Sequence, residues 1–397
     1  MNTKEEGTTR RNHVGLLGSI LGLASLLLPW LSVRESRLAA GESLGFLDAS
    51  ATPLAAAIVV AWLLALALSL NPGASRRPLA LAGAGALLLP LTLLAAGTGA
   101  TSVLDPAQPL SRASLGAGVW LSLFASYLLL HGTLSKLHTR PLARRLLAAA
   151  GPLLVLVLAL SGTLDDLSLA KELAGNEHRF LEETRRHVAL SLGSVAIGAC
   201  IAVPLGVAAA RRRRAERPIF LLSSAIETIP SLALFGLIIA PLSALSFAFP
   251  ALREMGIRGV GATPAIIALV LYSLLPIVHN TYAGLRHVSP AARDAGRGMG
   301  MSPRQLSWRV EYPLAAPLIG EGIRTATIQS IGNTAVAALI GAGGLGHFIF
   351  QGLGQAAPDL ILLGALPVIA LALAADLLMQ AVIRVLTPKG IRTEAQQ

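Results

Sequence analysis

The sequence predicts an all-α polytopic membrane protein, and three observations lead to this prediction. The chain has 397 residues, of which 54% are hydrophobic and 13% are charged, and its mean hydropathy is +0.66. Its apolar residues stand in runs of about 18 or more, the length that crosses a bilayer as a helix, rather than in amphipathic stripes. Its Lys and Arg residues are concentrated in alternate loops, as in proteins oriented by the positive-inside rule.

Ten membrane spans are expected, five in each half of the chain. Their ranges are 14–31, 53–70, 79–98, 115–134, 146–164, 188–210, 219–241, 263–283, 314–340 and 359–386. The division falls at 165–187, a polar stretch with ten charged residues that we expect to be an external linker. This gives an accessory region of five spans at 1–164, a core at 188–388 and a cytoplasmic tail at 389–397.

The formal net charge of +11 reflects orientation in the membrane rather than nucleic-acid binding. With the N-terminus inside, the segments expected in the cytoplasm hold 22 of the 32 Lys and Arg residues, and the outer loops hold nine. We therefore expect both termini in the cytoplasm. Arg10 and Arg11 could instead begin a cleaved signal, but the apolar run that follows favours a retained helix. Cys200 is the single cysteine, so neither a disulfide framework nor a cysteine metal site is expected.

The seventh span contains a proline in Ile226-Glu-Thr-Ile-Pro-Ser-Leu232. Pro230 removes a backbone donor there, and such a break is tolerated in a membrane where it is packed in protein or lines a wet cavity. Thr228, Pro230 and Ser231 are therefore candidate residues of a translocation pathway. A plain packing kink is an equal alternative.

The ninth span, 314–340, is the most polar of the ten. Arg324, Thr327, Ser330 and Thr334 fall within about 120° of one another on a helix, so this face should point into the protein or toward water. With Asn333, these residues complete the candidate pathway. The alternative for Arg324 is a structural ion pair with Glu321, three residues away. On the tenth span, we expect Asp376 to be an interhelical partner rather than a proton carrier.

The polar segment between the eighth and ninth spans predicts two short helices joined by a turn. Residues 291–299 can form the first, and Gly300 can supply the positive φ of a sharp turn. Ser302-Pro-Arg-Gln305 is typical of a capping box with proline at the first helical position. The second helix is expected to stop before Pro313. Four apolar residues should offer a docking surface to a partner, although a loop lying on the membrane surface is the alternative; they are Met299, Met301, Leu306 and Trp308.

This segment resembles the cytoplasmic loop of bacterial ABC importer permeases, whose pattern is Glu-Ala-Ala, three residues, Gly, nine residues, Ile-x-Leu-Pro. The positions that match this pattern are Asp294, Ala295, Gly296, Gly300, Val310, Tyr312 and Pro313. The stretches that begin at Glu227, Pro264, Gly322 and Ala338 are similar to the permeases of the osmoprotectant importers, which take up glycine betaine, choline, carnitine or proline betaine. The resemblance covers about 188–388, and the additional N-terminal spans resemble those of longer variants.

The resemblance implies a type I importer core formed by the last five spans. It implies that loop 284–313 couples transport to a separate ATPase, with Met301, Ser302 and Pro303 joining the matched positions. It also implies a second permease subunit, identical or different, and an extracytoplasmic substrate-binding protein. The lipid around the chain would be that of a bacterial cytoplasmic (inner) membrane.

ATP and Mg²⁺ are expected on the partner, because the chain has no Gly-x-x-x-x-Gly-Lys-Ser/Thr loop; we expect no cofactor here and no enzyme activity. The alternative is an ion-coupled secondary transporter of a small polar solute, which should show an inverted repeat between its halves.

Overall fold

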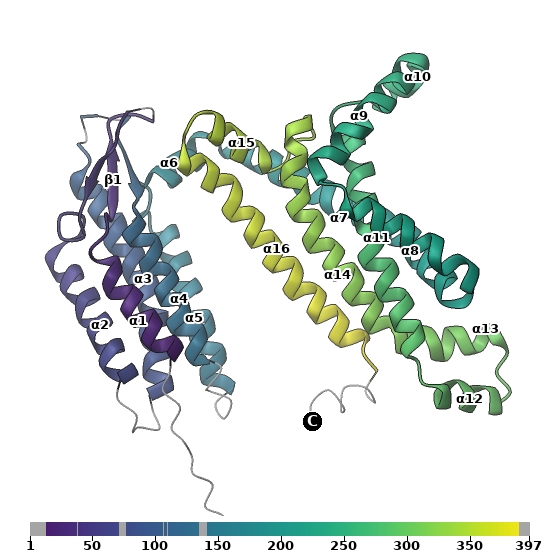
Figure 1. Cartoon of the computed structure of the whole chain (residues 1–397). Helices are drawn as coiled ribbons and strands as arrows, with labels where there is room; N and C mark the ends of the chain where they lie inside the picture. Colours follow the sequence, from purple (N-terminus) through teal and green to yellow (C-terminus); the bar gives the residue numbers. More distant parts are fainter. Residues whose placement is uncertain are drawn as a thin grey trace, which may run out of the picture. The chain divides into compact units, whose positions relative to one another are not determined.

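The computed structural model describes residues 13–37, 39–70, 77–105, 107–108, 110–134 and 141–388. The expected cytoplasmic tail, 389–397, and the residues Arg10 and Arg11 lie outside this range. The chain divides into two compact units, Met1–Gly175 and Asn176–Gln397, which are described separately (Figure 1).

The first unit contains five long helices and a small sheet. The helices are α1 (His13–Ser25), α2 (Thr52–Leu70), α3 (Arg77–Val103), α4 (Ala117–Leu134) and α5 (Pro141–Leu160). Strands β1 (Leu31–Arg34), β2 (Glu42–Leu44) and β3 (Arg112–Leu115) pair antiparallel in the order β2-β1-β3, with Leu31 opposite both Leu44 and Leu115. We did not expect these strands in an all-α chain.

The first span was expected to reach residue 31, but α1 ends at Ser25. Pro29 explains the difference, because proline lacks the N–H that a continuing helix needs and restricts the residue before it. The chain then places Trp30 in the core of the unit, where its indole Nε1 donates a hydrogen bond to the Ser25 carbonyl at 2.9 Å. Leu31 begins β1 instead of ending a helix.

Residues 165–187, which we expected to be an external polar linker, are mostly helical. They form α6 (Ser168–Gly175) and the first turns of α7 (Glu177–Arg211), which therefore begins eleven residues before Val188. Most of the charged residues in this stretch are exposed, but Glu172 is buried, and Arg37 and Arg112 both form ion pairs with its carboxylate. These pairs fix α6 against the sheet, since a buried carboxylate is costly without partners.

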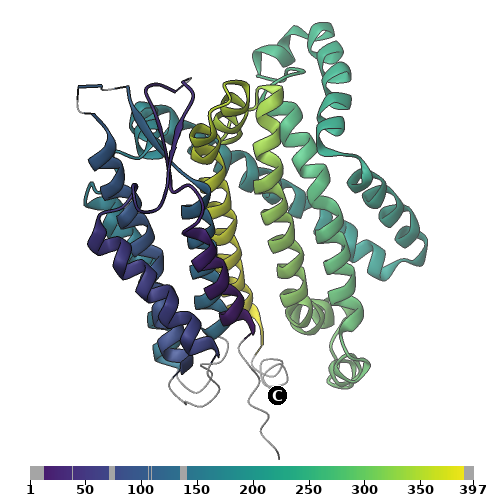
Figure 2. The same cartoon turned by 60° about the vertical axis from the view of Figure 1, so that its left-hand side comes forward.

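The second unit is built around three long helices. Helix α11 (Ala262–His287) packs between α7 and α14 (Tyr312–Ala337), and the two views show α11 and α14 side by side (Figures 1 and 2). Small residues allow this approach, because a Cβ added at Gly206 or Gly322 would lie 2.6 or 2.8 Å from α11 atoms. The remaining elements are α8 (Arg213–Thr228), α9 (Ser231–Ala248), α10 (Pro250–Glu254), α12 (Pro290–Gly298), α13 (Pro303–Leu306), a π-helical turn (Ser307–Glu311), a 3₁₀ turn (Ala338–Ile340), α15 (Gly346–Gly354) and α16 (Pro358–Leu386).

Eight helices among the described residues are long and apolar enough to span a membrane: α2, α3, α4, α5, α7, α9, α11 and α16. Two of the ten expected spans differ from these. Helix α1 is apolar but has only 13 residues, and α14 has 26 residues with polar side chains along its length. The expected seventh span is divided between α8 and α9.

The charge asymmetry predicts how the chain crosses the membrane. Reporter fusions after Arg214 should be active on the cytoplasmic side, whereas fusions at Gly175 and Arg253 should report the outside, because basic loops are retained inside. A fusion at Gly175 that reports the cytoplasm would contradict the division into five spans before this point and five after it.

Candidate functional site

The loop between α11 and α14 has the geometry that its sequence predicts. Helix α12 follows Ser289, whose side-chain oxygen accepts a hydrogen bond from the Ala292 N–H at 3.2 Å. Gly300 has φ of +76°, the left-handed conformation expected of it. The capping box is formed in both directions: the Ser302 N–H donates to Gln305 Oε1 at 2.8 Å, and the Gln305 N–H donates to Ser302 Oγ at 3.4 Å.

The second helix of the loop does not stop before Pro313, as we had expected. Helix α13 continues through the π-helical turn Ser307–Glu311 directly into α14, with Pro313 in its first turn. The wider turn explains this continuity, because the Tyr312 N–H reaches the Ser307 carbonyl five residues back. Val310, Tyr312 and Pro313 therefore lie on one helical rod that begins at Pro303.

The apolar surface of the loop is smaller than predicted. Met299 and Trp308 are 70% and 66% exposed, as expected of a docking surface. Leu306 is buried instead, because Gly296 leaves room for it: a Cβ at this glycine would lie 2.6 Å from Leu306 Cδ1. Gly296 thus holds α12 against α13, and Met301 lies at the same contact, 3.4 Å from that Cβ position.

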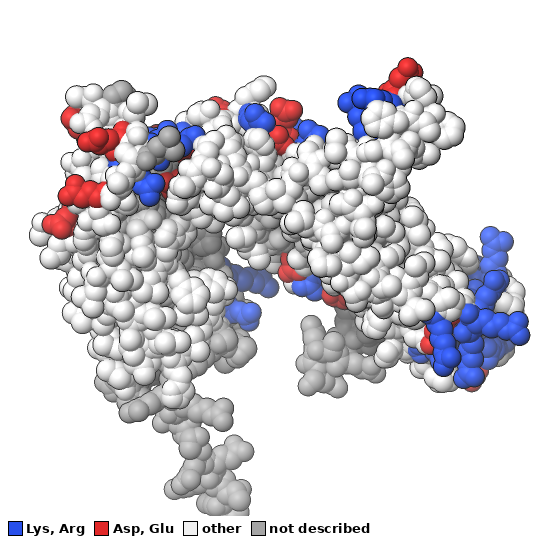
Figure 3. All heavy atoms as spheres, turned by 45° about the horizontal axis from the view of Figure 1, so that its top comes forward, with Lys and Arg blue, Asp and Glu red and all other residues white. Residues whose placement is uncertain are grey.

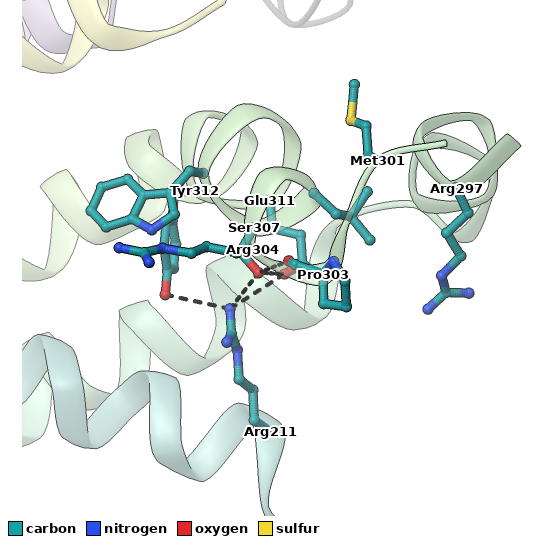
Figure 4. A pocket seen from close by; sticks show the side chains of 10 residues that line it. Arg211, Arg297, Met301, Pro303, Arg304, Ser307, Glu311 and Tyr312 are labelled. Atoms are coloured by element: carbon teal, nitrogen blue, oxygen red, sulfur yellow. Dashed lines mark hydrogen bonds and ion pairs between the residues drawn. The ribbon is translucent and has the colours of Figure 1, made fainter. Parts of the chain in front are cut away.

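A network of charged residues that we did not predict joins the loop to α7. At the end of α7, Arg211 donates a hydrogen bond to Ser307 Oγ at 2.8 Å and lies 3.5 Å from Glu311 Oε2 (Figure 4). The other Glu311 oxygen pairs with Arg293 of α12 at 3.0 Å. The Glu311 carboxylate therefore links three segments: α7, α12 and the π-helical turn. The only sign of this network in the sequence is that Glu311 is an acidic residue among the arginines of the loop.

These residues border a cavity of about 460 Å³ on the loop. Its lining is Arg211, Arg297, Met301, Pro303, Arg304, Leu306, Ser307, Trp308, Glu311 and Tyr312 (Figure 4). Asp294 and Ala295 do not line this cavity; Asp294 forms an exposed ion pair at 3.2 Å with Arg297, which does, and Ala295 lies on the same short helix. Lys and Arg side chains gather over this end of the second unit (Figure 3). The surface that a partner would meet here is basic with two exposed apolar side chains.

The predicted break in the seventh span is confirmed. Helix α8 ends at Thr228 and α9 begins at Ser231, with Ile229 and Pro230 extended between them. The Thr228 hydroxyl is exposed and donates back to the Ala225 carbonyl at 2.7 Å. The Ile229 carbonyl, which the break leaves outside the helix, accepts the hydroxyl of Tyr272 from α11 at 2.6 Å.

The hydroxyl face of α14 points into the protein, one of the two directions expected for it. Thr327, Ser330 and Thr334 are buried; Ser330 Oγ donates to the Ser191 carbonyl of α7 at 3.1 Å. The other two hydroxyls donate to carbonyls of α14 itself, at 2.8 and 2.7 Å. Asn333 is half-buried beside them. These candidates are thus packed against neighbouring helices in this conformation.

Arg324 has the partner predicted for it, Glu321, and a second one, Asp376. Its Nε donates to Asp376 Oδ1 of α16 at 2.6 Å, and its NH1 donates to Glu321 Oε2 at 2.9 Å. Gln380 donates to the second Asp376 oxygen at 2.8 Å. The prediction that Asp376 is an interhelical partner is confirmed, and the guanidinium links α14 to α16.

A second polar contact, absent from the predictions, lies on the exposed side of α14. Gln329 Nε2 donates to Glu227 Oε1 of α8 at 3.2 Å, across 102 positions of sequence. Neither residue was among the pathway candidates, although both stand beside residues that were. The signal that could have indicated Glu227 is its position directly before the predicted break.

Comparison with known proteins covers both halves of the chain. Residues 10–170 match the family described as the N-terminal domain of the ABC transporter permease YehY, and residues 202–389 match the binding-protein-dependent transport system inner membrane component. The choline transport system permease protein OpuBB of Bacillus subtilis is 42% identical over 217 residues, 55% of this chain and 93% of that protein. The osmoprotectant import permease protein OsmW of Salmonella typhimurium is 42% identical over 53% of this chain and 92% of that protein.

Among solved structures, a chain of the MetNI methionine ABC transporter in an inward-facing conformation is similar, with 20% identity and a TM-score of 0.46 over 53% of this chain and 96% of that one. The second of the two family matches, over residues 202–389, includes the loop around Gly300. This chain belongs to the family of osmoprotectant ABC importer permeases, in a long form with an additional N-terminal membrane region.

Proposed function

We propose that this chain is the transmembrane permease subunit of an ATP-driven importer for a compatible solute such as glycine betaine or choline. Loop 284–313 would couple it to a separate ATPase, with a substrate-binding protein outside and a second permease subunit beside it. Two relatives support the solute class, because their names assign choline or osmoprotectants to them. Membership of the family removes the alternative of a secondary transporter.

The observation that carries the proposal is the construction of the loop. Two helices are held at a fixed angle by Gly300, by the capping box and by the seating of Leu306 against Gly296. A loop that lies on a membrane surface needs none of these features. Met299 and Trp308 remain exposed at the basic end of the unit, which suits burial in a protein groove.

The N-terminal unit fits an accessory role in this proposal. Its side chains pack among themselves, with Trp30, Trp62 and Leu129 fully buried, and the Glu172 ion pairs close its sheet against α6. The core 188–388 would form the permease proper, in the cytoplasmic membrane with both termini inside. We propose no cofactor for this chain, with ATP and Mg²⁺ on the ATPase.

The test is uptake by the complete complex in proteoliposomes. With the binding protein outside and ATP inside, labelled choline or glycine betaine should accumulate. Accumulation should stop when the ATPase carries an inactivating substitution in its phosphate loop. Uptake that follows a sodium or proton gradient without ATP would contradict the proposal, as would uptake of neither solute under these conditions.

A further inference from the structure

We propose that Glu227, at the end of α8 beside the helix break, forms a negatively charged site on the solute pathway. This site favours solutes with a cationic head group over solutes that also carry a carboxylate. This inference deepens the proposed function and rests on it for the identity of the solute. Four residues form the site: Glu227 and Gln329, which are joined by a hydrogen bond, and Thr325 and Glu321 on the same face of α14 as Gln329.

The first step is the exposed face of α14. Glu321, Thr325 and Gln329 are spaced four residues apart, so they lie in one line along the helix. Thr325 and Gln329 are exposed, and the Glu321 side chain is 41% exposed. Polar and ionisable groups are costly against lipid, so this line faces water or another protein rather than hydrocarbon.

The second step is the position of Glu227. It is the penultimate residue of α8, where the negative end of the helix dipole makes a carboxylate unfavourable unless a cation is near. Among the described residues, no Lys or Arg forms an ion pair with this carboxylate. Its contact is the neutral amide of Gln329, which orients Oε1 and adds no charge.

The third step is the break itself. A helix interrupted inside a membrane turns the end of its backbone toward a cavity, and C-terminal ends of such half-helices attract cations in transporters. At this site the helix end and the carboxylate have the same sign, so their fields add. The Tyr272 hydroxyl fixes the extended residues by binding the Ile229 carbonyl, and the site therefore has a defined shape.

The chemistry that fits is a cation without a compensating negative group close to it. A quaternary ammonium alcohol such as choline satisfies this condition. Glycine betaine carries a carboxylate near its ammonium group, so the same field attracts one end of the molecule and repels the other. The site should therefore matter much more for choline than for glycine betaine.

The first experiment measures the charge preference of the site without any transported solute. In the assembled complex, with Cys200→Ala as background, Thr228→Cys places a thiol next to Glu227. A cationic methanethiosulfonate reagent should modify it about tenfold faster than an anionic one, after correction for their rates with free cysteine. Glu227→Gln should abolish this preference, because it keeps the side-chain shape and removes the charge.

Glu254→Gln is the matched control, since Glu254 is exposed on α10 and lies outside the proposed pathway. It should leave the preference unchanged. A thiol at 228 that reacts with neither reagent would overturn the proposal, because the site would then be closed to water. A preference that survives Glu227→Gln would also overturn it.

The second experiment measures selectivity in the uptake assay. Glu227→Gln should lower choline uptake by roughly tenfold and glycine betaine uptake by less than about twofold. Equal loss of both solutes would overturn the proposal, because it would indicate a structural role. If the unaltered complex transports neither solute, the proposed function fails, while the thiol measurement still decides whether the site selects cations.

Discussion

Gly300→Val should abolish most of the ATPase stimulation by the binding protein while leaving the complex inserted and assembled. Gly300 has φ of +76°, where a β-branched residue costs about 1–3 kcal/mol. The position is open, with no heavy atom within 4 Å of an added Cβ, so the penalty arises from the backbone and not from a clash. The turn relieves this strain by changing the angle between α12 and α13, and roughly a tenfold loss of stimulated hydrolysis is expected.

Gly298→Val is the control for this prediction. Gly298 lies two residues earlier, is equally open, and is not among the glycines with positive φ. It should retain most of the stimulation, so that the difference between the two variants reports the turn alone. Normal stimulation of the Gly300 variant in proteoliposomes would contradict the coupling role of the loop.

Arg324→Leu should lower the amount of folded protein in the membrane by roughly an order of magnitude. The guanidinium is the shared partner of Glu321 and Asp376, at 2.9 and 2.6 Å, and its removal leaves two carboxylates near each other without a cation, one of them only 23% exposed. Size-exclusion chromatography of fluorescently tagged protein, solubilised from membranes, measures the folded fraction.

The double variant Arg324→Leu with Asp376→Leu should recover several-fold more folded protein than the single one. Removing both members of this ion pair is less harmful than removing the arginine alone, because only the carboxylate of Glu321, which is 41% exposed, is then left without its partner. Arg258→Leu, at an exposed arginine outside the helices, should have little effect. A double variant that folds no better than Arg324→Leu would show that the residues do not act as a pair.

The features that the sequence predicted correctly depend on neighbouring residues. Gly300, the Ser302–Gln305 capping box and the break at Pro230 are each decided within about four positions of chain, by φ preferences, side-chain caps and a missing N–H. The length and hydropathy of the apolar runs likewise predicted most of the spanning helices.

The features that it missed depend on contacts between distant segments. Glu311 was unremarkable until the fold placed it between Arg211 and Arg293, and Glu227 lies 102 positions from its partner Gln329. The burial of Glu172 was missed, because nothing nearby in the sequence showed that Arg37 and Arg112 would pair with it. The π-helical turn was missed for a different reason. The rule that proline ends a helix assumes regular α geometry, which the chain leaves at Ser307.

Because α13, the π-helical turn and α14 are continuous, this segment could move as one rigid rod that pivots at Gly300, the fulcrum. From Pro303 to Gln329 the rod has a length of about 39 Å at 1.5 Å per residue. A tilt of about 5° at the fulcrum would therefore carry Gln329 through an arc of roughly 3 Å, the span of one hydrogen bond. That displacement is large enough to separate Gln329 from Glu227. A small rotation at the basic end of the rod would therefore break or form the hydrogen bond between them at the helix break.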